Sequence, residues 1–342
     1  MRRALQLARK NENYARPNPS VGAIIVYRDQ IIGEGYTSNF GGNHAEINAI
    51  NSLDARHLEK LSQATLYVTL EPCAHFGKTP PCALAIAKHN IPKVVVGYKD
   101  PNPKVSGKGL KLMQEKGIEV LYGILEEECA WVHRKFLSTF TDNRPYITLK
   151  WAETTDQFIA PIKEKQLQGS PYPISSAYSK QWAHKLRSEH GGIVIGAETL
   201  RIDQPRLNNR LWAGLDPRIF VLGGDDTSIP EFWNTLKSKI YLLQQNPIKQ
   251  NSGTITRIRL NSKNEALNQL FEICKNEAID SLLIEGGSNL LQQFIDRGLW
   301  NEAFVFQSKT LLRSGIKAPV IMAKAKRIST SGCDSLKYYV RT

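Results

Sequence analysis

Four residues in the first third of the chain have the types and spacing of a catalytic zinc site. His44 and Glu46 lie two positions apart in the motif HAE, while Cys73 ends the motif EPC and Cys82 follows two prolines. A hydrolytic zinc site needs three ligands from His, Cys or carboxylate, an open position for water, and a separate group that moves protons. We therefore expect His44, Cys73 and Cys82 to bind Zn²⁺. Glu46 is the candidate catalytic residue.

The same residue types are used by zinc deaminases, in which water replaces an amino group on a nucleobase-like ring and ammonia leaves. Each part of the pattern is weak alone, because a lone His beside Glu is more often a surface or core residue. Two cysteines alone are more often buried apolar side chains. Their combination with PNPSVG upstream favours the catalytic interpretation. His75 has the spacing of a fourth ligand, which would close the site and make the zinc structural.

The elements expected around these residues are strands alternating with helices. Apolar β-rich runs predict strands in the first part of the chain, at 21–29, 31–36, 64–72, 93–98 and 118–123. Helical periodicity is found at 1–8, 82–90, 108–117 and 126–140. His44 lies where a helix begins, Cys73 follows a strand, and Cys82 heads a helix. Backbone N–H groups at helix starts favour the thiolates that zinc requires.

The polar segment TDNRP separates this part from a second series of strands and helices. Strands are expected there at 145–152, 191–197, 218–224, 239–245, 280–287 and 302–308. Alternation of strands and helices indicates an α/β fold in both parts. We expect two domains, residues 1–144 and 145–342, without internal repeats.

Composition narrows the class of protein. The 342 residues are 41% apolar, enough for two cores, and no apolar run approaches the roughly 20 residues of a membrane span. Five scattered cysteines argue against a disulfide framework and favour the cytoplasm. The net charge of +13 is spread over both halves. It therefore favours a solvated basic surface or a small phosphorylated ligand over nucleic acid.

A nucleic-acid-editing deaminase is the rival interpretation of the zinc motif. Editing enzymes have two residues between their cysteines, in the pattern P-C-x-x-C. Eight residues separate Cys73 from Cys82. A nucleic-acid-editing enzyme also does not account for the strand-rich second half of the chain. A deaminase of a small pyrimidine is therefore favoured.

Four segments carry a more specific resemblance: PNPSVGAIIV, HAEINAI, TLEPCAHFGKTPPCALAI and KDPNPKVSGKGL. Together they resemble the bifunctional deaminase-reductase family of riboflavin biosynthesis over nearly all of residues 1–125. The resemblance implies a cytidine-deaminase-like three-layer domain that deaminates 2,5-diamino-6-(5-phosphoribosylamino)pyrimidin-4(3H)-one. Asn18 would line its substrate pocket. The family usually has Arg where this chain has Lys78, which keeps the charge but loses the bidentate fork.

The second half is similar to the reductase domain of the same family, which has a dihydrofolate-reductase-like fold and uses NADPH to reduce the ribosyl group to ribityl. Two segments, HKLRSEHGGIVIGAETLRIDQPRLNNR and LLIEGGSNLLQQFI, carry this similarity. The residues that it implies for substrate are Arg187, Leu207, Arg210 and Glu285. Those that it implies for the cofactor are Glu153, Pro173, Thr199, Asp203, Gly287, Ser288 and Asn289. A Gly-Gly turn entering a helix independently suits a phosphate, although it is more often only a turn.

Three positions depart from the family pattern of the reductase. Gln157 stands where Gly is usual, Pro173 stands where Trp is common, and Glu153 occupies a cofactor-contact position. A deaminase with a degenerate reductase domain is therefore the alternative function. Family members are oligomers, so a homo-oligomer is expected.

Overall fold

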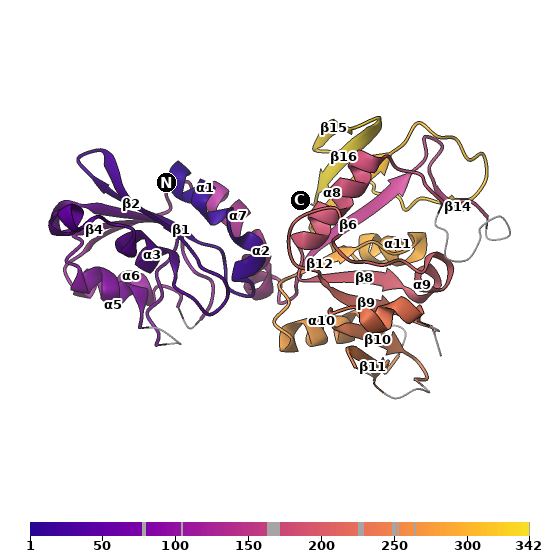
Figure 1. The fold of residues 1–342 in the computed structure, drawn as a ribbon, viewed down its shortest axis with the longest axis horizontal. Coiled ribbons are helices and arrows are strands. Elements are labelled where there is room, and N and C mark those ends of the chain that lie inside the picture. The colour runs from indigo at the N-terminus through magenta and orange to yellow at the C-terminus, as the bar shows by residue number, and fades with distance from the viewer. Residues whose placement is uncertain are drawn as a thin grey trace. The chain divides into compact units, whose positions relative to one another are not determined.

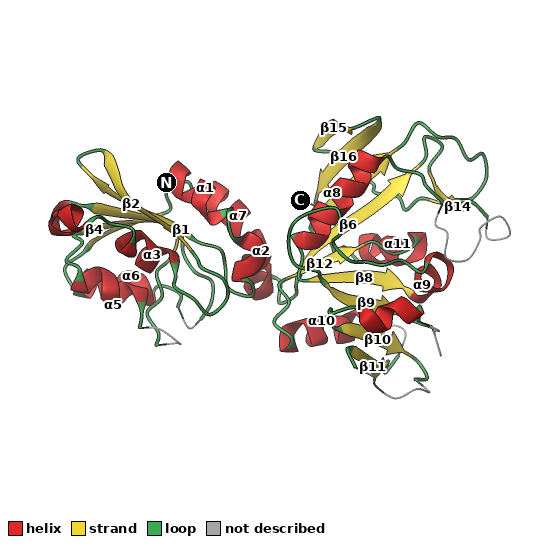
Figure 2. Cartoon of the chain, viewed as in Figure 1, coloured by secondary structure: helices red, strands yellow, loops and turns green. Residues whose placement is uncertain are grey.

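The computed structural model describes residues 1–76, 80–103, 105–162, 172–224, 229–247, 251, 253–262 and 265–341. The chain divides into two compact units, Met1–Asn143 and Arg144–Thr342. Each unit has its own large sheet with helices on its faces (Figures 1 and 2). The expected α/β fold is confirmed.

The first unit contains a five-stranded sheet in the order β2-β1-β3-β4-β5. Its strands are β1 (Gly22–Tyr27), β2 (Gln30–Tyr36), β3 (Thr65–Leu70), β4 (Lys93–Tyr98) and β5 (Glu119–Tyr122). β1 pairs antiparallel with both β2 and β3, whereas β3, β4 and β5 are parallel. The carboxyl ends of β3 and β4 therefore lie at the same edge of the sheet.

Helices cover both faces of this sheet, which gives the expected three layers (Figure 1). They are α1 (Arg2–Ala8), α2 (Glu12–Ala15), α3 (Ala45–Asn51), α4 (Ala55–Leu58), the 3-10 helix η1 (Glu59–Gln63), α5 (Cys82–Lys88), α6 (Lys108–Glu115) and α7 (Glu126–Thr141). Neighbouring residues of β1 face opposite layers: Ile24 packs with α1 and Ile25 packs with the cluster that includes α3. This alternation is the period-2 pattern of a strand buried on both faces.

The second unit contains a nine-stranded sheet in the order β11-β10-β9-β8-β12-β6-β13-β16-β15. Its strands are β6 (Tyr146–Glu153), β8 (Gly192–Gly196), β9 (Arg218–Leu222), β10 (Ile240–Gln244), β11 (Ile255–Arg259), β12 (Ser281–Ile284), β13 (Glu302–Gln307), β15 (Arg327–Ser331) and β16 (Asp334–Val340). Pairing is parallel from β11 to β13 and antiparallel at β16 and β15. A small separate sheet joins β7 (Phe158–Ala160) to β14 (Ile316–Lys317).

Helices again pack on both faces of the large sheet. They are α8 (Ala177–Ser188), α9 (Ala197–Asp203), the 3-10 helix η3 (Glu231–Thr235), α10 (Ala266–Asn276) and α11 (Ser288–Asp296). The main core joins α10 and α11 to inward residues such as Leu149, Phe220 and Ile284. On the opposite face, α8 packs through Leu186 against Phe304.

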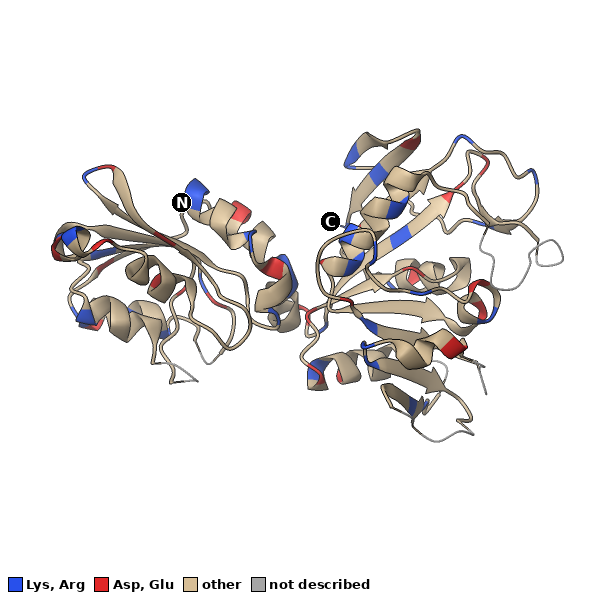
Figure 3. Ribbon diagram, in the orientation of Figure 1, with Lys and Arg blue, Asp and Glu red and all other residues tan. Residues whose placement is uncertain are grey.

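Lys, Arg, Asp and Glu residues are interspersed along the ribbons of the two units (Figure 3). Within the described part of the chain, Lys and Arg occur on elements of both units, which agrees with their spread along the sequence. Among the described residues, no helix combines the length and apolar character needed to cross a membrane.

Candidate active sites

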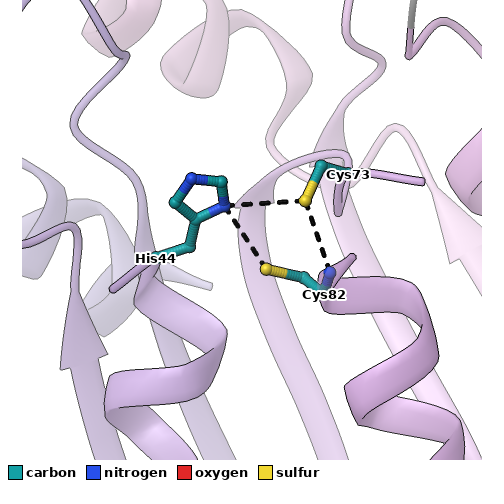
Figure 4. A group of neighbouring side chains, drawn as sticks. All are labelled: His44, Cys73 and Cys82. Atoms are coloured by element: carbon teal, nitrogen blue, oxygen red, sulfur yellow. Dashed lines mark hydrogen bonds between the residues drawn. The ribbon is translucent and has the colours of Figure 1, made fainter. Parts of the chain in front are cut away.

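The three expected zinc ligands converge in the first unit, where their side chains point toward one another (Figure 4). His44 immediately precedes α3, Cys73 follows the end of β3, and Cys82 begins α5. The His44 Nδ1 lies 3.6 Å from the Cys73 Sγ and 3.4 Å from the Cys82 Sγ. Bond lengths of about 2.3 Å for Zn–S and about 2.0 Å for Zn–N place N and S about 3.5 Å apart in a tetrahedral site. The donor set therefore fits zinc.

The electrostatics of the two cysteines also suit a divalent cation. Contact with Cys82 lowers the pKa of the Cys73 thiol to about 4, and His44 acts in the same direction. The backbone N–H of Cys82 donates to the Cys73 Sγ at 3.3 Å. The same contact raises the pKa of Cys82, because two adjacent thiolates repel each other. A bound zinc ion would offset the repulsion between the two thiolates, because its positive charge stabilises both of them.

Glu46 lies in the first turn of α3, where its side chain is buried beside the ligands. Burial raises the pKa of Glu46 to about 7, although the neighbouring His44 lowers it. A carboxyl group with a pKa near the working pH can both accept and return a proton. Glu46 also lines a cavity of about 330 Å³ together with His44 and Cys73.

His75 lines the same cavity but is not a member of the metal-donor group found among the described residues. Among the residues that the structure describes, three donors converge and His75 does not join them, which suits the open three-ligand type of site. Asn18 lines the cavity as well. Lys78 lies outside the described residues.

Two further polar residues of this cavity, Asp100 and Asn102, were not singled out from the sequence. They follow β4 at the same edge of the sheet as Cys73, and burial raises the pKa of Asp100 to about 6. Polar residues directly after a buried parallel strand are a signal that could have found them, because ligands bind at carboxyl ends of such strands.

The second unit contains a cavity of about 420 Å³ at the carboxyl ends of its central strands. Seven of the residues assigned from the resemblance line it: Pro173, Thr199, Asp203, Glu285, Gly287, Ser288 and Asn289. The Gly287 N–H donates to the Thr199 Oγ1 at 3.0 Å, and α11 begins at the next residue. Backbone N–H groups of its first turn are therefore available beside the cavity.

A buried cluster of charges lies at the edge of this cavity. Arg187 forms a bidentate ion pair with Glu285, at 2.9 and 2.8 Å, and also donates to the Asn208 carbonyl at 3.1 Å. The Lys150 Nζ lies 3.9 Å from the Glu285 carboxylate. Burial alone would raise the pKa of Glu285, but Arg187 and Lys150 outweigh it and hold the pKa at about 2.

Lys150, which lines the cavity, was missed in the sequence. Burial lowers its pKa, and Glu285 opposes that effect. A single Lys within the apolar strand YITLKWAE is unusual, because an ammonium group inside a sheet needs a carboxylate partner. This lysine within an apolar strand could therefore have been predicted from the sequence as a candidate site residue.

The remaining assigned residues lie outside the lining of the second cavity. The Glu153 carboxylate accepts hydrogen bonds from Trp151 at 2.9 Å and Gln307 at 3.1 Å, so its side chain is committed within the sheet. Leu207 is buried, and the exposed Arg210 donates to the Asn208 Oδ1 at 3.0 Å.

Comparison with known proteins identifies the chain. Residues 1–98 match the cytidine and deoxycytidylate deaminase zinc-binding region, and residues 145–315 match the RibD C-terminal domain. The riboflavin biosynthesis protein RibD of Aquifex aeolicus is 35% identical over 326 residues, which cover 92% of this chain and 88% of that protein. The chain belongs to the RibD family. RibD of Bacillus amyloliquefaciens is 33% identical over 98% of this chain and 89% of that protein.

Solved structures agree with membership of the RibD family. The diaminohydroxyphosphoribosylaminopyrimidine deaminase/5-amino-6-(5-phosphoribosylamino)uracil reductase of Thermotoga maritima superposes with a TM-score of 0.87 at 31% identity, covering 99% of this chain and 96% of that one. Acinetobacter baumannii RibD, form 1, gives 0.86 at 29% identity and covers 100% and 97%. The chain is therefore a RibD enzyme of riboflavin biosynthesis with a deaminase and a reductase domain, and its cofactors are zinc and NADPH.

Proposed function

We propose that the first unit deaminates 2,5-diamino-6-(5-phosphoribosylamino)pyrimidin-4(3H)-one and that the second unit then reduces the ribosyl group to ribityl with NADPH. The observation that carries the first step is the set of His44, Cys73 and Cys82 donors, two of which, His44 and Cys73, line one cavity together with the buried Glu46. The similarity to the T. maritima enzyme over both units supports the order of the two reactions.

In the first step, a C–NH₂ group and water become C=O and ammonia. Zinc, when bound, lowers the pKa of the water at its open position toward 7. Glu46 accepts a proton from water and transfers it to the leaving amino group. Asn18, Asp100 and Asn102 offer hydrogen bonds to the ring from the cavity wall.

In the second step, the C1–O bond of the ribosyl ring breaks, C1 gains a hydride and the released ring oxygen gains a proton, which leaves the open-chain ribityl group. NADPH supplies the hydride when it is bound. The N–H groups in the first turn of α11, at Ser288 and Asn289, suit a cofactor phosphate. Lys150 can donate a proton at the sugar beside the Glu285 carboxylate, which Arg187 holds in place, while the exposed Arg210 suits the substrate phosphate.

The test follows the two reactions separately in zinc-loaded protein: ammonia release with the diaminopyrimidinone substrate, and NADPH oxidation. The variant is Glu46→Gln, which keeps the size of the side chain but removes the proton acceptor. We expect ammonia release to fall by at least about 100-fold, because general acid–base groups contribute that much. NADPH oxidation with already deaminated substrate should remain, which controls for folding.

The other outcomes of this experiment test the deaminase and the reductase assignments separately. Unchanged ammonia release in Glu46→Gln, or no release by the wild-type protein, contradicts the deaminase assignment. Ammonia release without NADPH oxidation means that the departures at Glu153, Gln157 and Pro173 have disabled the reductase.

The setting of the enzyme is part of the same proposal. We expect a homo-oligomer in the cytoplasm, with a phosphorylated pyrimidine as its substrate and without nucleic-acid or membrane partners. Light scattering of the purified protein measures the mass in solution, and a value near 38.5 kDa, the mass of one chain, would contradict the oligomer.

A further inference from the structure

Glu71 is a buried carboxylate that lies next to the zinc-binding turn but is not a ligand. It stands between β3 and Cys73, and only 4% of its surface is exposed. Its two oxygens accept four backbone hydrogen bonds. Oε2 accepts from Asp100 at 3.2 Å and from Gly107 at 3.0 Å. Oε1 accepts from Gly109 at 3.0 Å and from Leu110 at 3.3 Å.

All four donors belong to one segment, residues 100–110, of which the structure describes all but residue 104. This segment brings Asp100 and Asn102 to the wall of the first cavity and then continues into α6. Glu71 therefore holds the segment at both ends, at Asp100 on one side and at the start of the helix on the other.

The start of α6 explains why a carboxylate is needed. Its N-cap residue is Gly107, which has no side chain to accept the first N–H groups of the helix. These groups are without partners inside the helix and carry partial positive charge. Glu71, far away in the sequence, supplies the missing acceptors through its two carboxyl oxygens.

A second contact joins the same two elements. A Cβ atom at Gly109 would collide with the carbonyl oxygen of Pro72, the residue between Glu71 and Cys73. The start of α6 therefore rests directly on the turn that carries the metal ligand. A side chain at position 109 would separate them.

We propose that Glu71 is a positioning residue for deamination: it fixes the segment that carries Asp100 and Asn102 at a set place relative to the metal-binding turn. This rests on the proposed deaminase reaction. Glu71 touches neither substrate nor metal in this role. It acts through the backbone of the segment that lines the cavity.

The first test is Glu71→Gln, which preserves shape but replaces one acceptor oxygen by an NH₂ donor facing N–H groups. We expect kcat/KM for ammonia release to fall by about 10- to 100-fold, with KM carrying most of the change, because small displacements of binding groups are costly. Zinc content and NADPH oxidation with deaminated substrate should stay at wild-type values. Glu115→Gln, the same change at an exposed position of α6, is the matched control.

A readout that does not depend on activity separates this inference from the proposed reaction. Hydrogen exchange at Asp100, Gly107, Gly109 and Leu110 should become at least about tenfold faster in Glu71→Gln, while amides of β3 keep their rates. Gly109→Ala should reproduce the rise in KM, and it tests the junction even where Glu71→Gln folds poorly.

Unchanged exchange together with kcat/KM within twofold of wild type would overturn the proposal. Loss of zinc in parallel with activity would also overturn it, because Glu71 would then support the metal turn rather than the substrate segment. A wild-type protein that releases no ammonia refutes the reaction, whereas the exchange result still tests the contact.

Discussion

Gln157 is a residue whose backbone conformation conflicts with its type. Its φ is 63°, in the left-handed region, within the turn that joins β6 to β7. A Cβ atom in this region is strained by about 1–2 kcal/mol, whereas glycine is free of that strain. This conformation suits the glycine that the family resemblance implies at the position.

We predict that Gln157→Gly raises the free energy of unfolding by about 1 kcal/mol, less than the full strain because glycine also gains freedom in the unfolded chain. Thermal unfolding of the unit that carries each substitution measures the change. Gln114→Gly, at an exposed position in α6, should instead destabilise by a similar amount. Equal effects of the two substitutions would refute the explanation.

Single residues differed in how well the sequence revealed them. His44, Cys73 and Cys82 were found because zinc restricts residue type and spacing. The role of Glu71 could not be predicted from the EPC motif, since its partners are backbone groups 29 to 39 positions away and leave no pattern of side chains. The hydrogen bonds that Glu153 accepts from Trp151 and Gln307 could not be predicted either, because they depend on strand pairing.

Helix α7 contacts the sheet of the first unit through a buried, neutral histidine. His133 is buried, and its Nε2 lies 3.0 Å from the Thr69 Oγ1 on β3. Burial lowers the pKa of His133 from 6.5 to about 4, although the Glu12 carboxylate on α2 opposes the effect. As the pH falls from 6.5 to 4, the unfolded chain therefore binds a proton that the folded unit does not, and stability is lost.

The predicted size of this loss is about 2–3 kcal/mol across that window, since one pKa unit corresponds to about 1.4 kcal/mol. The measurement is urea unfolding of zinc-saturated protein at pH 7 and pH 5, between which about 2 kcal/mol of this loss should appear. His133→Gln should show a smaller difference between the two pH values than the wild type. His57→Gln, at a partly exposed position, controls for loss of an imidazole, and an identical pH difference in all three proteins would contradict the prediction.

Elements were predictable where burial made the pattern strong. The central strands of both sheets are continuous apolar runs, such as KVVVGY and SLLI, and the structure contains them. β15 was missed, because four of its five residues are exposed and its sequence, RISTS, has no apolar repeat. β16 and β11 were missed for a related reason: they have mixed polarity and owe their pairing to neighbours in the sheet.

The whole molecule consists of two units with separate cores, so removal of the metal should affect them differently. Chelation of zinc is predicted to abolish ammonia release and to lower the unfolding temperature of the first unit, because metal binding stabilises the folded state. NADPH oxidation with deaminated substrate should continue. Restoring zinc should restore ammonia release, and a parallel loss of both activities would refute the independence of the units.

The eight residues between Cys73 and Cys82 have a consequence for how this site can change over evolutionary time. One cysteine leaves from the end of β3 and the other opens α5, so two fixed elements hold the sulfur atoms in place. The eight residues that connect them have only to span the short distance between the end of β3 and the start of α5. Its length and composition are thus free to diverge with the substrate while the reaction chemistry is inherited intact.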